Sequence, residues 1–152
     1  MRYLQFSLLF VLVHTGAYVI AGMLALNISK DLYHGENRLL DFANDMSDPD
    51  QSKRTQKWFI PAQLLRGLLL SIVLYPVLGA LGDLSFGLRF AFMAGFMFVY
   101  TTFASALSFP PNIERSVYLT DRYLSREAFW KLQFEIIIYS LMFGLFASWL
   151  LF

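Results

Sequence analysis

The chain has 152 residues, of which 57% are apolar and 15% are charged, and its net charge is +1. Average soluble domains carry about 25% charged residues, and 18 of the 23 charged side chains here lie in two segments, residues 27–57 and 109–131. This composition excludes a soluble globular domain, a disordered chain and a nucleic-acid-binding protein. It predicts a protein that resides in a lipid bilayer.

Four apolar segments are long enough to cross a membrane. A transmembrane helix needs about 20 mainly apolar residues, and the run of three isoleucines at residues 136–138 lacks the alternation of a transmembrane β-strand. The sequence therefore predicts an all-α membrane protein, one integral membrane domain over residues 1–152 that folds as a four-transmembrane-helix bundle. The spans are expected at about residues 3–26, 59–81, 86–107 and 130–152, with polar loops at 27–57 and 109–129.

The first span, at about residues 3–26, is expected to pack closely against its neighbours. Ala17, Ala21 and Ala25 recur every four residues, and such rows of small side chains let helix backbones approach one another in a membrane. The apolar run is also longer than the 7–15 residues typical of a secretory signal peptide. A retained span is therefore favoured over a cleaved leader.

The first loop is expected to contain a short interfacial helix. Leu39, Phe42, Ala43 and Met46 have the i, i+3, i+4, i+7 spacing of one helical face, which is typical of a helix that lies on a membrane surface. An alternative interpretation is that this apolar face simply covers the end of the bundle. A turn-forming stretch at residues 47–52 then leads toward the second span.

Prolines mark positions where helices start, bend or stop. Pro61 is expected in the first turn of the second span, where a missing backbone donor is tolerated, and Pro76 is expected to kink that span. Pro110 and Pro111 are expected to end the third span, and Ser125 has the chemistry of an N-cap for the fourth.

No catalytic, cofactor-binding or metal-binding motif is present in the loops. Neither loop contains a glycine-rich phosphate loop, a paired-carboxylate motif or a nucleophile elbow. There are no cysteines, and the two histidines are too few for a histidine-based metal site without carboxylates. The sequence therefore predicts a protein that is not an enzyme and that needs no cofactor.

The distribution of basic residues predicts the orientation in the membrane. Nine lysines and arginines lie on the side of the two loops, whereas only Arg2 and Arg89 lie on the other side. By the positive-inside rule the loops are expected in the cytoplasm and both termini outside, in a bacterial inner membrane. Arg2 and the free amine favour the opposite orientation for the first helix, so this alternative stays open.

Ionisable residues within apolar spans are costly and point to function by default. Arg66 lies about 12 Å along its helix from Trp58, and Glu135 lies about 7–8 Å from Trp130. The two charges are therefore expected at compatible depths, as an ion pair between the second and fourth spans. Thr101 and Thr102 are expected to help satisfy the guanidinium. The candidate polar cluster comprises Arg66, Glu135, Gln63, His14, Tyr139 and Ser105.

Two interpretations of this cluster remain open. In the structural one, the ion pair only specifies which helices are neighbours. In the functional one, the charges line a polar cavity that binds a headgroup, an ion or a proton. His14, near the middle of the first span, is expected to hydrogen-bond across helices to a tyrosine or threonine hydroxyl, because a proton relay would need a partner at its depth that the sequence does not reveal.

Three classes of function are consistent with these features. The favoured one is a small membrane protein that acts by binding, as an accessory subunit, a regulator or an immunity-type protein. Its expected partners are the lipid bilayer and another membrane protein or a second copy of itself. The alternative is a small homo-oligomeric transporter or channel that uses Arg66, Glu135 and His14. An intramembrane enzyme acting on lipid lacks the carboxylate–histidine or metal cluster that it would need.

Overall fold

The computed structural model describes residues 3–103 and 126–152, and within these ranges it contains helices and no strand. The all-α prediction is therefore confirmed for the described part of the chain. The elements are α1 (Tyr3–Tyr33), α2 (Pro49–Val73), a 3₁₀ turn (Tyr75–Val77), α3 (Leu78–Asp83), α4 (Phe86–Phe103) and α6 (Arg126–Leu150).

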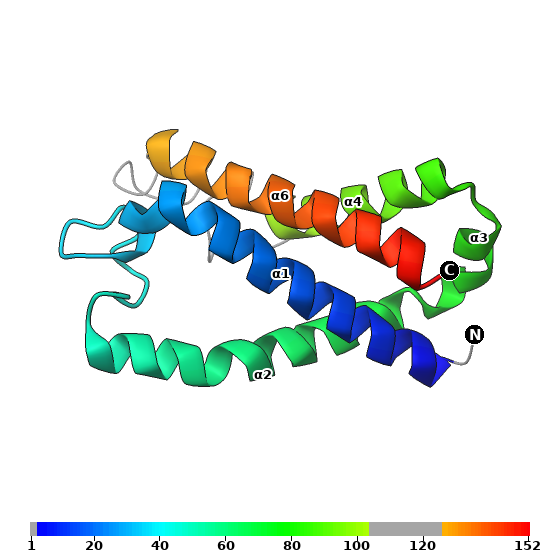
Figure 1. The fold of residues 1–152 in the computed structure, drawn as a ribbon, viewed down its shortest axis with the longest axis horizontal. Helices are drawn as coiled ribbons and strands as arrows, with labels where there is room; N and C mark the ends of the chain where they lie inside the picture. The colour runs from blue at the N-terminus through cyan, green and yellow to red at the C-terminus, as the bar shows by residue number, and fades with distance from the viewer. Residues whose placement is uncertain (1–2, 104–125) are drawn as a thin grey trace.

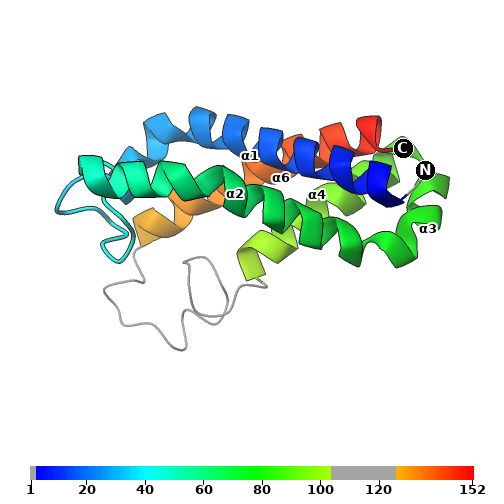
Figure 2. The same cartoon turned by 90° about the horizontal axis from the view of Figure 1, so that it is seen from below.

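The four long helices lie side by side along one axis (Figures 1 and 2). Helix α6 packs against both α4 and α1, and α1 packs against α2, whereas α2 and α4 are not packed together along their length. Among residues 3–103 and 126–152 the helices therefore form a curved layer in the order α4, α6, α1, α2, and its two outer members are not packed against each other. Both termini lie at the end opposite the loop that joins α1 to α2 (Figure 1).

Two helices, α1 and α6, are long and apolar enough to cross a membrane. Helix α2 and the following segment Tyr75–Asp83 qualify as a third span if the two are counted together across a bend of 44°. The described part of α4 is apolar but shorter. Length and composition thus support two or three spans and residence in a membrane.

The first loop is shorter than the sequence predicts, because both flanking helices extend into the segment 27–57. Helix α1 continues to Tyr33 across a kink at Ser29, whose backbone angles are not helical and whose hydroxyl donates to the Ala25 carbonyl. Helix α2 already begins at Pro49, because the Asp48 side chain accepts hydrogen bonds from two backbone amides of the first turn and proline is favoured at the first helical position. The connecting loop therefore comprises only residues 34–48.

The prediction of an interfacial helix in the first loop is wrong, because residues 34–48 form turns and bends. Gly35 has a φ of 89°, which ends the helical path. The Arg38 guanidinium donates to the carbonyl oxygens of Asp41 and Ala43, and Asp45 accepts from the Ser47 hydroxyl and from the amides of Ser47 and Gly35. These hydrogen bonds lower the pKa of Asp45 to about 2. Side chains thus form hydrogen bonds with backbone amides and carbonyls that would bond to each other in a helix.

The second predicted span is interrupted, as Pro76 indicates. Pro76 cannot donate to the Ile72 carbonyl, and α2 ends at Val73 with the Leu74 amide turning back to Ile72 and Ser71. Pro61 lies inside α2 rather than in its first turn, because the helix begins at Pro49. This corrects the expected position of Pro61 and confirms the bend at Pro76.

The described α6 begins at Arg126, as an N-cap at Ser125 predicts, and therefore extends from the predicted fourth span into the predicted loop 109–129. The predicted end of the third span near residue 107 lies outside the described residues. The same is true of Pro110, Pro111 and Ser125, to which the sequence assigns the stop and the N-cap.

The core is an aromatic and small-residue contact between α1 and α6. Phe10 of α1 meets Phe143 of α6 edge to face, with ring centroids 5.1 Å apart. Ala17, Ala21 and Ala25 are all buried, as their four-residue spacing predicts. Polar contacts lie at both ends of α1. The Ser7 hydroxyl bonds those of Ser71 in α2 and Tyr75 in the 3₁₀ turn, and the Lys131 ammonium of α6 pairs with Asp31.

Helices α4 and α6 approach most closely at Gly144. A Cβ atom added there would lie 2.6 Å from the Ala94 Cβ and 2.8 Å from the Ala94 backbone nitrogen. Any side chain at residue 144 would therefore push the two helix backbones apart.

We predict that Gly144→Ala lowers the free energy of unfolding by about 1–3 kcal/mol, because the overpacked contact includes backbone atoms that cannot move independently. Gly95→Ala in α4 is the matched control: a Cβ there meets no atom of the described residues within 4 Å, and alanine favours a helix by up to about 1 kcal/mol. Thermal unfolding of the two variants in detergent measures the difference. Equal stability of both would contradict the described α4–α6 contact.

Candidate functional site

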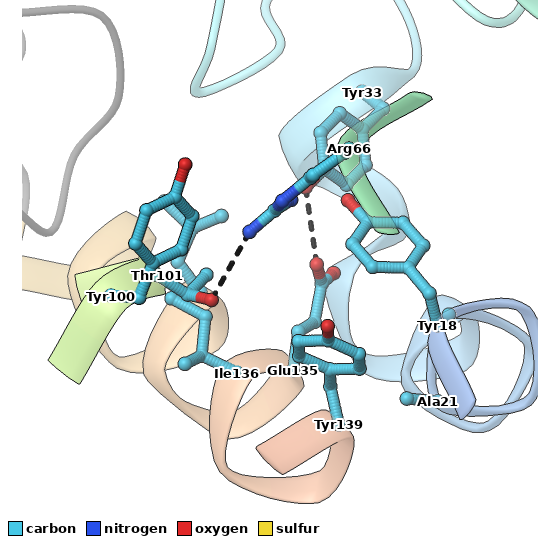
Figure 3. Close-up of a pocket in the computed structure, with 11 residues that line it drawn as sticks. Tyr18, Ala21, Tyr33, Arg66, Tyr100, Thr101, Glu135, Ile136 and Tyr139 are labelled. Carbon is cyan, nitrogen blue, oxygen red and sulfur yellow. Dashed lines mark hydrogen bonds between the residues drawn. The ribbon is translucent and has the colours of Figure 1, made fainter. Parts of the chain in front are cut away.

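A pocket of about 280 Å³ lies among α1, α2, α4 and α6 (Figure 3). It is toward the end of the helices that carries the loop 34–48, because Tyr33, the last residue of α1, is part of its wall. The lining combines two opposite charges with four tyrosines. The lining residues are Tyr18, Ala21, Gly22, Tyr33, Arg66, Tyr100, Thr101, Leu132, Glu135, Ile136 and Tyr139.

Arg66 reaches from α2 across the open side of the layer to α4. Its Nη2 atom donates to the Thr101 hydroxyl at 3.3 Å, which confirms the expected help from Thr101. The guanidinium carbon lies 5.4 Å from the centre of the Tyr100 ring and 6.0 Å from that of Tyr18. These distances are typical of cation–π contacts, which stabilise the charge without using its N–H donors.

Glu135 lies on α6 and faces the same pocket, but its contact is with α1. The Tyr33 hydroxyl donates to Glu135 Oε2 at 3.2 Å. Although Arg66 and Glu135 are both described, their side chains form no ion pair within 4.0 Å. The predicted direct ion pair is therefore wrong: the guanidinium extends toward Thr101 on α4, and the carboxylate is held by Tyr33 (Figure 3).

His14 and Tyr139 form a buried hydrogen bond at the base of the pocket. The Tyr139 hydroxyl and His14 Nδ1 are 2.5 Å apart, and the two side chains are 3% and 0% exposed. The expected cross-helix bond to a tyrosine hydroxyl is confirmed, and Tyr139 is the partner at the depth of His14 that the sequence did not reveal. His14 Nε2 has no hydrogen-bond partner among residues 3–103 and 126–152.

The structure brings together only part of the predicted cluster. Arg66, Glu135 and Tyr139 line the pocket, and His14 lies behind Tyr139. Gln63 is outside the lining, and its buried Oε1 has no hydrogen-bond partner within the described part of the chain. Ser105 lies outside the described residues.

Sequence reasoning missed three of the four pocket tyrosines. Tyr33 was beyond reach because the first span was expected to end near residue 26, seven residues before the observed end of α1. Tyr18 follows His14 by one helical turn, and Tyr100 directly precedes Thr101. A search for tyrosines one turn from, or next to, the intramembrane polar residues would have found these two.

The donor set of the pocket is suited to binding polar groups of either charge. Arginine offers five N–H donors, of which one is bonded to Thr101, and the carboxylate of Glu135 has acceptor capacity beyond the bond from Tyr33. No group of three or more metal-ligating side chains occurs in the described ranges. The arrangement therefore fits a ligand with its own donors and acceptors.

Comparison with known proteins assigns no family. No protein-family model, no curated protein and no solved structure matches the chain. The chemistry of the pocket is therefore the basis for a functional assignment.

We predict that Tyr139→Phe lowers the free energy of unfolding by about 1–3 kcal/mol, because it leaves the fully buried His14 without its hydrogen bond. Tyr18→Phe is the matched control: it removes a hydroxyl from the same pocket and keeps the ring beneath Arg66. The control is expected to change stability by at most about 0.5 kcal/mol. Chemical unfolding in detergent micelles provides both values, and a control as destabilising as Tyr139→Phe would refute the special role of this bond.

Proposed function

We propose that the chain is an integral membrane protein with four transmembrane helices: α1, α2 together with α3, α4 and α6. The long helices expose large apolar side chains, among them Leu12, Met23 and Trp149, each at least 66% exposed. Lipid is the natural environment for such surfaces. Both termini lie at one end of the layer (Figure 1), as an even number of spans requires.

The orientation with cytoplasmic loops and external termini rests on the positions of the basic residues. Lysines and arginines concentrate at the loop end, and exposed Trp58 and Trp130 lie near the same end. Tryptophan is typical of the membrane–water interface, and basic residues are typical of the cytoplasmic side. The proposed location is a bacterial inner membrane.

We infer that the protein acts by binding, and that the pocket among α1, α2, α4 and α6 holds an amphiphilic ligand by its polar head. The observation that carries this proposal is that Arg66 and Glu135 line one pocket without pairing. Within the described ranges neither side chain has a partner of opposite charge. Charges in an apolar surrounding are costly without such a partner, and a ligand that contacts them would offset that cost. In the described part of the chain, the side between α2 and α4 is not closed by helix packing, and this side is the proposed path of the ligand from the bilayer.

Transport through a single chain receives less support. Between the pocket and the terminal end, the core is closed by Phe10, His14 and Phe143, each 0% exposed. A continuous path would require these side chains to move or a second copy of the chain to complete it. The alternative of a homo-oligomeric transporter therefore ranks below binding.

The binding proposal predicts that lipid stays with the protein through purification and is lost when the arginine is replaced. We expect Arg66→Gln to lower the lipid retained per protein after extensive detergent washing by about tenfold, which corresponds to 1.4 kcal/mol. Arg54→Gln, the same change on the exposed part of α2, is the control and should retain as much lipid as the wild type. Organic extraction followed by mass spectrometry measures the retained lipid.

Equal retention in the wild type and in Arg66→Gln would contradict the proposal. The far-ultraviolet circular dichroism spectrum and the size-exclusion profile of each variant show whether it is folded, so that a loss of lipid is not confused with a loss of structure.

A further inference from the structure

The pocket presents two opposite charges that are held apart by different partners. The Arg66 guanidinium is directed to α4 by the Thr101 hydroxyl and the Tyr100 ring, and the Glu135 carboxylate is held by the Tyr33 hydroxyl of α1 (Figure 3). A ligand with a single charge would pair with one of these groups and leave the other without an opposite charge among the residues that the structure describes, which is unfavourable in an apolar surrounding. A ligand with both charges contacts both groups.

We propose that the pocket binds a zwitterionic headgroup that consists of a phosphate and a primary ammonium, as in phosphatidylethanolamine or in free phosphoethanolamine. This inference rests on the binding function proposed above and names the chemistry of the ligand. The phosphate accepts paired hydrogen bonds from Arg66, whose planar guanidinium matches two phosphate oxygens, and one from the Thr101 hydroxyl. The ammonium donates to Glu135 and to the Tyr33 hydroxyl oxygen.

The size of the pocket fits a headgroup and not an entire lipid. Sites for drug-sized ligands have volumes of about 300–1,000 Å³, and this pocket has about 280 Å³. The acyl chains of a bound lipid would leave through the open side between α2 and α4, where the two helices are not packed together. Apolar lining residues, among them Leu132 and Ile136, contact the carbon atoms between the two charged groups.

The ring contacts favour a primary over a quaternary ammonium. Quaternary ammonium groups are typically bound by cages of aromatic rings, but two of the four pocket tyrosines, Tyr18 and Tyr100, already contact the Arg66 guanidinium with their rings. A primary ammonium instead needs oxygen acceptors for its three N–H groups. Glu135 and Tyr33 provide them on the opposite wall of the pocket.

A headgroup series tests the proposal without altering the protein. Delipidated full-length protein in detergent is titrated with short-chain phosphatidylethanolamine, its mono- and dimethylated forms, phosphatidylcholine and phosphatidylglycerol, and binding is measured by isothermal titration calorimetry. We expect affinity to fall with each added methyl group and to be at least tenfold lower for phosphatidylcholine and phosphatidylglycerol than for phosphatidylethanolamine.

Two variants assign the affinity to the two charges. Arg66→Gln and Glu135→Gln are each expected to weaken binding of phosphatidylethanolamine at least tenfold, whereas the control Arg54→Gln is expected to bind like the wild type. A titration with free phosphoethanolamine shows whether the headgroup comes from a lipid or from a water-soluble molecule. Weaker binding than the lipid supports a membrane lipid as the ligand, and equal binding supports a water-soluble ligand with the same phosphate and ammonium groups.

The outcomes separate this inference from the binding function itself. If phosphatidylglycerol or phosphatidylcholine binds as tightly as phosphatidylethanolamine, and Arg66→Gln abolishes this binding, the zwitterionic assignment is overturned and the binding function stands. Binding that is unchanged in Arg66→Gln for every lipid of the series would overturn both.

Discussion

The hydrogen bond between Tyr139 and His14 is the interaction on which the arrangement of the helices depends. Apolar side chains alone give little preference for one register of two helices in a lipid environment, because lipid tails are as apolar as the side chains. A buried imidazole provides that preference when its hydrogen-bond partner is within reach in only one register. The bond joins α1 to α6 one helical turn from the aromatic contact between Phe10 and Phe143, and both bonded side chains are buried.

The pocket lies next to this bond, because Tyr139 belongs to both. With α1 and α6 aligned at His14 and Tyr139, Tyr33 of α1 lies beside Glu135 of α6. Arg66 is held separately, by the Tyr18 and Tyr100 rings and by Thr101. Each charge thus has a partner of its own, and the space between them remains available to a ligand. A preorganised site of this kind avoids the cost of rearranging side chains on binding.

Much of the fold could be predicted from the sequence, because apolar runs and prolines act locally. The helical class, the buried row of Ala17, Ala21 and Ala25, and the bend at Pro76 all follow from such signals. The loop boundaries and the turns in place of the expected interfacial helix could not be predicted in this way. They depend on hydrogen bonds such as those of Asp48 and Asp45 with nearby backbone amides. Spacing alone does not reveal which backbone groups these side chains bind.

The candidate site could be predicted only in part for a related reason. Distances along the helices place Arg66 and Glu135 at similar depths, but depth does not determine the direction in which each side chain points around its helix. The expected ion pair therefore failed, although both residues do line one pocket. The most direct test is a double-mutant cycle on the free energy of unfolding of the delipidated protein, with Arg66→Gln, Glu135→Gln and the double variant. Additive effects, within about 0.5 kcal/mol, are expected for side chains that do not pair, whereas a coupling free energy of about 2 kcal/mol or more would show a direct ion pair and contradict the pocket described here.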